Sequence, residues 1–224
     1  WLRGFIRIIK DPHQVGLEGN AEPLKSIVFA GILEAAASLF ITWLHRQNPA
    51  LIAENISMMK PWMKHGTQQQ TSTLTSLPFD QALLSTLTTS FIGILAFGFI
   101  MWLIHWALTK ESKKLYESAG IASYGSGVYA IGMILTGLSA FAFNSLQWGA
   151  HAGILIAPAS NPFLFAILAR INLFSIISYV LASYAVIGYS KIESRYGVIA
   201  SVIAIILILS WYGIFAIIGS HLTS

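Results

Sequence analysis

The chain has 224 residues, of which 55% are hydrophobic and only 10% are charged, and its net charge is +4. A soluble domain of this size is roughly 25% charged, so this sequence lacks the side chains that coat a water-facing surface. Its basic residues lie in short polar segments between apolar stretches, and we expect no nucleic-acid partner. The absence of cysteine excludes disulfides, thiolate metal sites and cysteine nucleophiles.

The first 22 residues are too charged for a signal sequence. They contain three basic and three acidic side chains and no apolar core of the kind that a signal peptide needs, so we expect no cleavable leader among them. The chain begins with a tryptophan, from which we expect the numbering to start inside a longer protein.

Five later stretches are long and apolar enough to cross a membrane, since a transmembrane helix needs about 20 mostly apolar residues. Pro23 precedes the first of them, at a position where a helix tolerates proline. The predicted spans cover about residues 24–44, 83–108, 121–143, 163–189 and 197–219. The sequence therefore predicts an all-α, polytopic helical membrane protein that forms a single membrane domain over residues 1–224.

The basic residues that flank these spans predict their orientation, because cytoplasmic loops carry an excess of lysine and arginine. With the N-terminus in the cytoplasm, the inner segments hold Arg3, Arg7, Lys10, Lys25, Lys110, Lys113, Lys114, Lys191 and Arg195. The outer segments then hold Arg46, Lys60 and Lys64. This asymmetry predicts a cytoplasmic N-terminus and an external C-terminus.

The outer segments also contain apolar stretches. In the loop of residues 45–82, residues 50–63 predict a short interfacial helix, with Trp62 as its anchor in the membrane surface. A polar linker follows this helix. In the second outer loop, residues 149–159 are apolar enough to lie on the membrane surface or to dip into it.

Three side chains of the first outer loop could offer ligands to a metal. Met59, Met63 and His65 are of the type that binds Cu(I). An apolar interfacial helix explains the methionines more simply, and we expect neither a metal nor a cofactor.

The first predicted span carries a carboxylate at its centre. Glu34 is the midpoint of residues 24–44, where an ionised acid costs about 2.5–3.5 kcal/mol. The residues one helical turn before and after it are all small: Ala30, Gly31, Ala37 and Ser38. Such a face lets another helix approach closely, so we expect Glu34 to point into the bundle and not toward lipid.

The expected partner of Glu34 is Arg170 in the fourth span. Arg170 lies roughly 10 Å deep, and its long side chain can reach the midplane, which lies about 15 Å deep. Three alternatives stay open. The acid is protonated and bonded to Asn172, Ser38 or a backbone carbonyl; or it handles a proton or cation; or a shifted helix brings it to the surface.

Other features of the spans favour structural roles. His105 lies between Trp102 and Trp106 near the inner end of the second span, which predicts an aromatic belt at the membrane interface, with a ligand or proton-relay role as the alternative. In the third span, Gly132, Thr136 and Ala140 repeat at four-residue spacing, which favours close helix packing. The chain lacks hydrolase, zinc-protease and phosphate-loop motifs, so we expect no enzyme.

The layout of the chain resembles a known family. A short segment, IRIIKDPHQVG, precedes the five predicted spans. The second span ends in the basic loop TKESKKLYESAG, the third opens with ASYGSGVYAIGMIL, and the fourth carries INLFSIISYVLASYAVIGYSKIESRYGV. Over about residues 6–218 this pattern resembles the prokaryotic branch of the Yip family, whose eukaryotic members interact with Rab GTPases. The acidic-Leu-Tyr-Gly-Pro motif of those members is matched only by Asp11 and Pro12.

The resemblance implies five spans, a cytoplasmic N-terminus and no catalysis. We expect a non-enzymatic protein of a prokaryotic plasma (inner) membrane that organises lipids or membrane-protein partners, with a homo-oligomer as one form. The alternative is a small transporter or channel for protons, cations or a small solute that uses Glu34 and Arg170 as a buried charge site.

Overall fold

The computed structural model describes residues 2–19, 22–59, 79–111, 114–157, 160–161, 164–165, 168–169 and 171–222, with the backbone alone for 55–59, 79–80 and 211–222. Every regular element in this part of the chain is a helix, which confirms the all-α class. An isolated β-bridge joins His151 to Asn172.

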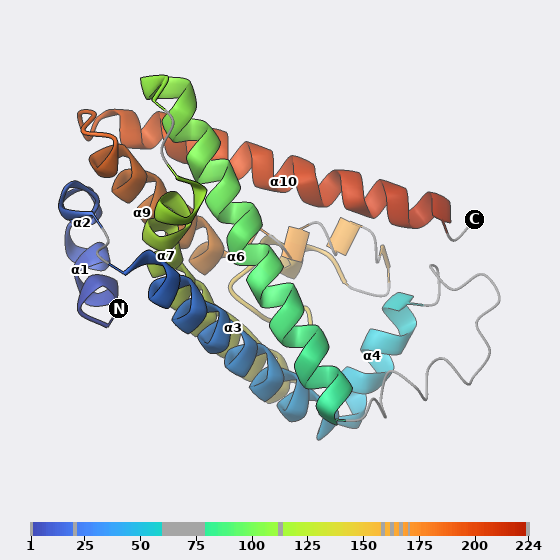
Figure 1. Ribbon diagram of the computed structural model, residues 1–224. Coiled ribbons are helices and arrows are strands. Elements are labelled where there is room, and N and C mark those ends of the chain that lie inside the picture. Colours follow the sequence, from blue (N-terminus) through green and yellow to red (C-terminus); the bar gives the residue numbers. More distant parts are fainter. Residues whose placement is uncertain are drawn as a thin grey trace.

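Nine helical segments follow one another along the described chain (Figure 1). They are α1 (Leu2–Lys10), α2 (Pro12–Glu18), α3 (Pro23–Arg46), α4 (Pro49–Met59), α6 (Phe79–Thr109), α7 (Leu115–Phe143), the 3-10 helix η2 (Ala152–Leu155), α9 (Leu173–Tyr189) and α10 (Tyr196–Leu222). Within the described residues, α3, α6 and α7 are long and apolar enough to cross a membrane. Residues 173–189 and 196–210 form shorter apolar helices.

Helices α3 and α7 run in the same direction along each other. A side chain at Gly120, near the start of α7, would meet Pro23 at the start of α3, and one at Gly137 would meet Ile41 near the end of α3. Helix α6 runs in the opposite direction. Phe91 meets Gly31 near the middle of α3, whereas Gly98, further along α6, meets Ala119 beside the start of α3.

Helix α9 also runs opposite to α7. Gly125 faces Ser178 and Gly132 faces Phe174, so the contact moves toward the start of α9 as it moves along α7. Helix α10 turns back after Tyr189, and Gly197 at its start packs against the ring of Tyr184. The long helices therefore alternate in direction along the chain in the order α3, α6, α7, α9, α10. As a result α3 and α7 run parallel, and these two helices also pack against each other.

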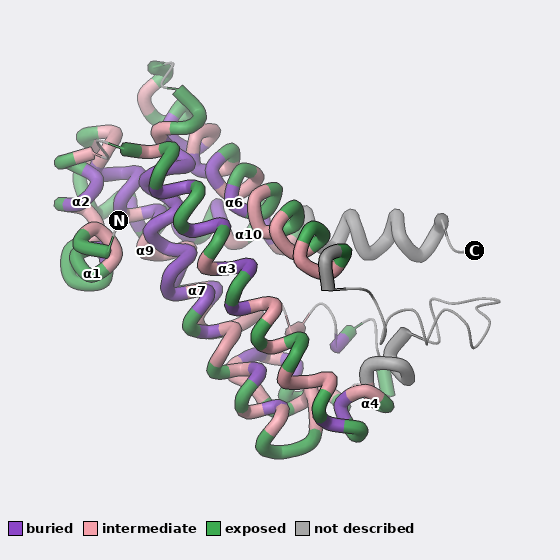
Figure 2. Tube along the Cα trace, turned by 60° about the horizontal axis from the view of Figure 1, so that its bottom comes forward, coloured by how far each residue is buried: buried purple, intermediate pink, exposed green. Residues whose placement is uncertain are grey.

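The core lies around α7. Buried residues follow the first half of α7 and the second half of α9, while the outward faces of α3 and α6 are largely exposed (Figure 2). One buried cluster joins residues of α1, α2, α6, α7, α9 and α10: Ile8, Val15, Met101, Ile104, Ile121, Ala122, Tyr124, Ala182, Ala185, Val186, Ile187, Ala200 and Ala204. The exposed apolar faces suit contact with lipid, which is as apolar as they are.

The short helices α1 and α2 fold back onto the end of the bundle, beside the start of α3 (Figure 1). Asp11 caps α2 by accepting a bond from the backbone N–H of Gln14 at 3.0 Å, and Pro12 occupies the first turn, where proline fits. Helix α2 crosses α9 so closely that a Cβ at Gly16 would lie 1.8 Å from the carbonyl oxygen of Ala185. The chain thus uses a glycine where two helix backbones meet.

Among the described residues, the helix predicted over residues 163–189 is interrupted at Ile171 and Asn172. Helix α9 begins only at Leu173, because Asn172 has an extended backbone and its side-chain oxygen accepts the N–H of Phe174 at 2.8 Å as an N-cap. The backbone on both sides of Asn172 also pairs with residues 150–152, which holds it out of a helix. Apolar composition could not reveal this stop.

The other predicted boundaries agree with the helices to within six residues. The interfacial helix predicted over 50–63 corresponds to α4, which begins at Pro49 and runs to Met59. Met63, His65 and the polar linker lie outside the described residues. Glu54 on α4 accepts bonds from the Ser145 hydroxyl at 3.0 Å and the Leu146 N–H at 2.5 Å, so α4 is tied to the turn after α7.

We expect a methyl group at the α2–α9 crossing to destabilise the protein. Gly16→Ala or Gly188→Ala would place a Cβ about 2 Å from a backbone carbonyl of the other helix, and overpacking of this kind costs about 1–3 kcal/mol. Thermal unfolding in detergent measures the loss. Gly93→Ala in α6 is the matched control, because no atom lies within 4 Å of its new Cβ. If all three variants unfold at the wild-type temperature, the crossing is not a tight contact.

Candidate functional site

Glu34 lies in the seam between α3 and α7. It is the twelfth of the 24 residues of α3, and its exposed fraction is 8%. Ala30, Ala35 and Ala37 beside it are buried, as expected for a small-residue face against another helix. The structure therefore places the carboxylate inside the bundle at mid-helix.

The hydroxyl of Ser126 on α7 is a hydrogen-bond donor that lies beside the Glu34 carboxyl. Ser126 is itself buried, in the segment Gly125-Ser126-Gly127. An acid that is removed from water needs such a donor, because a buried polar group without a partner costs several kcal/mol in an apolar medium. Sequence reasoning named Ser38 and missed Ser126, although Ser126 lies in the third predicted span among the small residues that close packing requires.

The structure separates Asn172 from Glu34. The Asn172 side chain donates to the Thr136 hydroxyl at 3.1 Å, and Thr136 lies ten residues beyond Ser126 on α7. At 1.5 Å per residue, the two contacts are about 15 Å apart along the helix. Arg170, the predicted ion-pair partner of Glu34, lies outside the described residues.

The packing predicted from the four-residue ridge in the third span is confirmed. A side chain at Gly132 would collide with Phe174, Thr136 accepts the bond from Asn172, and Ala140 is buried. This ridge of α7 is therefore the surface on which the start of α9 rests.

A second polar cluster lies at the end of the bundle that carries α1 and α2. The Tyr189 hydroxyl at the end of α9 donates to Glu117 at the start of α7, at 2.5 Å. His105 Nδ1 lies 2.6 Å from the Ser190 hydroxyl, and that hydroxyl donates its own proton to the Val186 carbonyl. His105 Nδ1 is therefore the donor in this pair. The cluster joins the ends of α6, α7 and α9.

His105 is not part of an aromatic interfacial belt, contrary to the prediction. Its ring is completely buried and lies 5.7 Å from the ring of Tyr189, whereas the next residue, Trp106, is 44% exposed with Lys110 over its ring. Successive residues of a helix point about 100° apart, so one faces the core and the other faces outward. Glu117 and Ser126 are nine residues apart on α7, or about 14 Å, so this cluster does not reach Glu34.

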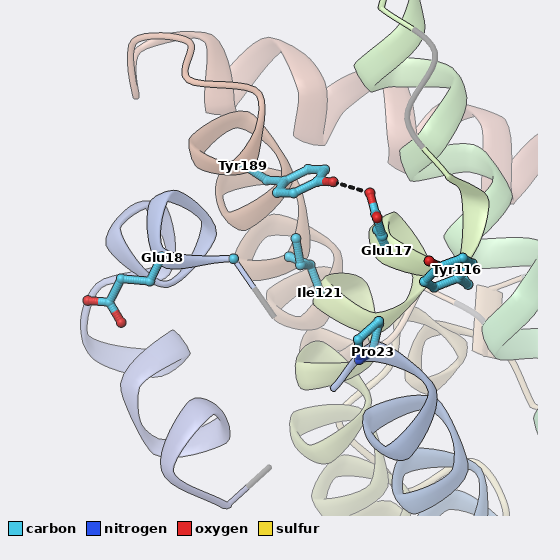
Figure 3. Close-up of a pocket in the computed structure, with 7 residues that line it drawn as sticks. Glu18, Pro23, Tyr116, Glu117, Ile121 and Tyr189 are labelled. Carbon is cyan, nitrogen blue, oxygen red and sulfur yellow. Dashed lines mark hydrogen bonds between the residues drawn. The ribbon is translucent and has the colours of Figure 1, made fainter. Parts of the chain in front are cut away.

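A cavity of about 410 Å³ opens beside the second cluster. It is lined by Glu18, Gly19, Pro23, Tyr116, Glu117, Ile121 and Tyr189. Figure 3 shows Tyr189 and Glu117 pointing toward each other across it, while the Glu18 carboxylate points away. Glu18 is instead paired with Arg7 at 2.5 Å, and this hydrogen bond lowers the pKa of the Glu18 carboxyl below its ordinary value.

Metal ligands do not gather in the part of the chain that the structure describes. No group of three or more His, Asp or Glu side chains there is placed to hold an ion. Of the methionine and histidine candidates, Met63 and His65 fall outside the described residues, as does the side chain of Met59.

The fold and these two clusters define an all-helical chain with three helices of membrane-spanning length and a buried acid between two of them. No protein-family model, curated protein or solved structure matches this chain.

We expect Tyr189→Phe to destabilise the end of the bundle that carries α1 and α2. The change removes the hydroxyl that bonds Glu117, and a hydrogen bond to a charged group contributes about 1.5–3 kcal/mol. Thermal unfolding in detergent measures the effect. Tyr184→Phe, on the same helix and half-buried, is the matched control. Equal unfolding temperatures for the two variants would contradict a structural role for the Tyr189–Glu117 bond.

Proposed function

We propose that this chain is a non-enzymatic integral protein of a prokaryotic plasma membrane that organises protein partners or lipids within the bilayer. In this proposal five helices cross the membrane, with the N-terminus in the cytoplasm and the C-terminus outside. The three helices of membrane length support it, as does the alternating direction of α9 and α10 after them. The resemblance to the prokaryotic branch of the Yip family supports the same class.

The burial of Glu34 in the seam between α3 and α7 carries the proposal. The hydroxyl of Ser126 on the neighbouring helix lies beside the buried acid, and small residues bring that helix close. The cavity described above is lined by residues near the α1–α2 end, and Glu34 is not among them. An acid held in this way ties α3 to α7 and gives the membrane domain a rigid shape on which partners or lipids can assemble.

One observation favours a second candidate function. Glu34 is an ionisable group at the middle of a membrane-length helix, and such groups commonly mark ion or proton pathways. A small transporter or channel for protons or cations would require Glu34 to change its protonation or its ligand during transport. A structural tie requires only that the hydrogen bond persists.

Ion flux separates the two candidates. In liposomes that contain a pH-sensitive dye, we expect purified wild-type protein and Glu34→Gln to show the proton and cation leak of empty liposomes. Gln retains an acceptor for the Ser126 hydroxyl, so we also expect Glu34→Gln to remain folded. Glu34 is the single acidic residue in the sequence of α3, so this substitution leaves the helix without a carboxylate that could replace it.

Glu54→Gln is the matched control for this assay. It removes a carboxylate from α4, about two helical turns beyond the end of α3, and leaves the seam between α3 and α7 intact. If the wild type and Glu54→Gln both show flux and Glu34→Gln shows none, the structural role of Glu34 is overturned and the transporter is established.

A further inference from the structure

Helix α1 has three distinct faces. With successive residues about 100° apart, Gly4, Phe5 and Ile8 share one face, and Arg3, Arg7 and Lys10 share a second. The third face carries Leu2, Ile6 and Ile9, with exposed fractions of 63%, 49% and 54%. A helix of a water-facing domain would not expose an apolar face beside a basic one.

Contacts with the bundle fix how α1 is rotated. A side chain at Gly4 would collide with the ring of Tyr124 on α7, and Ile8 is completely buried in the cluster that includes Tyr124. Because this face is held against α7, the apolar and basic faces both point away from the bundle. Figure 2 shows α1 as a largely exposed helix at the edge of the structure.

Two of the three basic side chains of α1 are available to bind an anion outside the protein. Arg7 is paired with Glu18, and Asp11 is used as the cap of α2. Arg3 and Lys10 form no ion pair with the residues that the structure describes, and both are exposed. The positive charge next to the apolar face is therefore not neutralised by the acids near it.

The length of α7 places α1 at a membrane boundary. Its 29 residues span about 43 Å, whereas the hydrocarbon core is about 30 Å thick. The ring of Phe143 at the end of α7 lies 5.3 Å from the ring of Trp148, an aromatic pair of the kind that marks an interface. Counting about 20 residues back from Phe143 brings the opposite boundary to Tyr124, the residue that α1 contacts.

We propose that α1 lies in the cytoplasmic interface of the bilayer, where Leu2, Ile6 and Ile9 contact acyl chains and Arg3 and Lys10 bind anionic lipid headgroups. The proposal rests on the membrane topology proposed above and names the lipid class that this protein recruits. A helix with one apolar and one basic exposed face binds an anionic membrane surface through both faces together. A protein partner or a second copy would need an acidic surface that matches Arg3 and Lys10.

Fluorescent probes attached to single cysteines test this contact, because the chain has no cysteine of its own. The probe is placed at Ile6→Cys, with Ile92→Cys on the exposed face of α6 as the lipid reference and Ser194→Cys in the turn before α10 as the water reference. The labelled proteins are reconstituted in phosphatidylcholine vesicles that contain a trace of doxyl-labelled phosphatidylglycerol or, separately, doxyl-labelled phosphatidylcholine.

We expect the Ile6 probe to emit like the Ile92 probe and to be quenched by doxyl lipid, more strongly by phosphatidylglycerol than by phosphatidylcholine. A probe that behaves like the one at Ser194 would place the apolar face in water and overturn the proposal. A blue-shifted probe that doxyl lipid does not quench would show that protein covers this face, from a partner or a second copy, and would also overturn it.

Charge variants test the headgroup contact separately. Arg3→Gln with Lys10→Gln should lower the phosphatidylglycerol preference at Ile6 by about fivefold for each charge removed at low ionic strength, since a basic residue at an anionic surface contributes about 1 kcal/mol. Lys114→Gln with Lys191→Gln removes two charges elsewhere on the same side as a matched control. If both double variants lose the phosphatidylglycerol preference equally, or if neither loses it, a specific role for Arg3 and Lys10 is refuted.

The outcome is independent of the flux assay. Flux through Glu34 would overturn the proposed scaffold function and leave the lipid contact of α1 in place. A water-exposed α1 would refute the lipid contact and leave the role of Glu34 unchanged.

Discussion

The contact between α3 and α7 is the constraint on which the rest of the structure depends. These two helices lie parallel, and small residues on both sides let their backbones approach closely. The close approach buries Glu34, and an acid removed from water needs a nearby donor, for which the Ser126 hydroxyl is placed. Helices α6 and α9 pack on α7 beside this pair, and both run antiparallel to it.

Several other polar side chains of the bundle form hydrogen bonds near its two ends. At one end Tyr189 bonds Glu117, and His105 bonds Ser190. At the other end Asn172 bonds Thr136, and Glu54 binds the turn after α7. In a bilayer no water is present to replace a lost partner, so each of these bonds also fixes the register of the helices that it joins.

The sequence was sufficient to predict the helical class and the approximate limits of α3, α6, α7 and α10. Apolar length carries that information, because a helix must be long enough to cross the hydrocarbon core. The same criterion did not predict the interruption at residues 171–172, directly before α9. That boundary depends on the cap made by Asn172 and on its bridge to His151, and both are tertiary features.

The site was predictable only in part. The small neighbours of Glu34 correctly indicated that it points into the bundle, but they could not identify which helix faces it. Ser126 became its partner because α7 runs parallel to α3, an arrangement that no span pattern encodes. His105 and Trp106 illustrate the same limit, since sequence places both at an interface whereas the rotation of α6 buries one and exposes the other.

We predict that Glu34 and Ser126 act as a coupled pair that holds α3 to α7. A double-mutant cycle with Glu34→Leu, Ser126→Ala and the double variant measures this directly, with the free energy of unfolding as the readout. We predict that the two losses are not additive, with a coupling of about 1 kcal/mol, within the range of hydrogen bonds between membrane helices. Losses that add to within about 0.3–0.5 kcal/mol would contradict the account, because independent residues behave in that way.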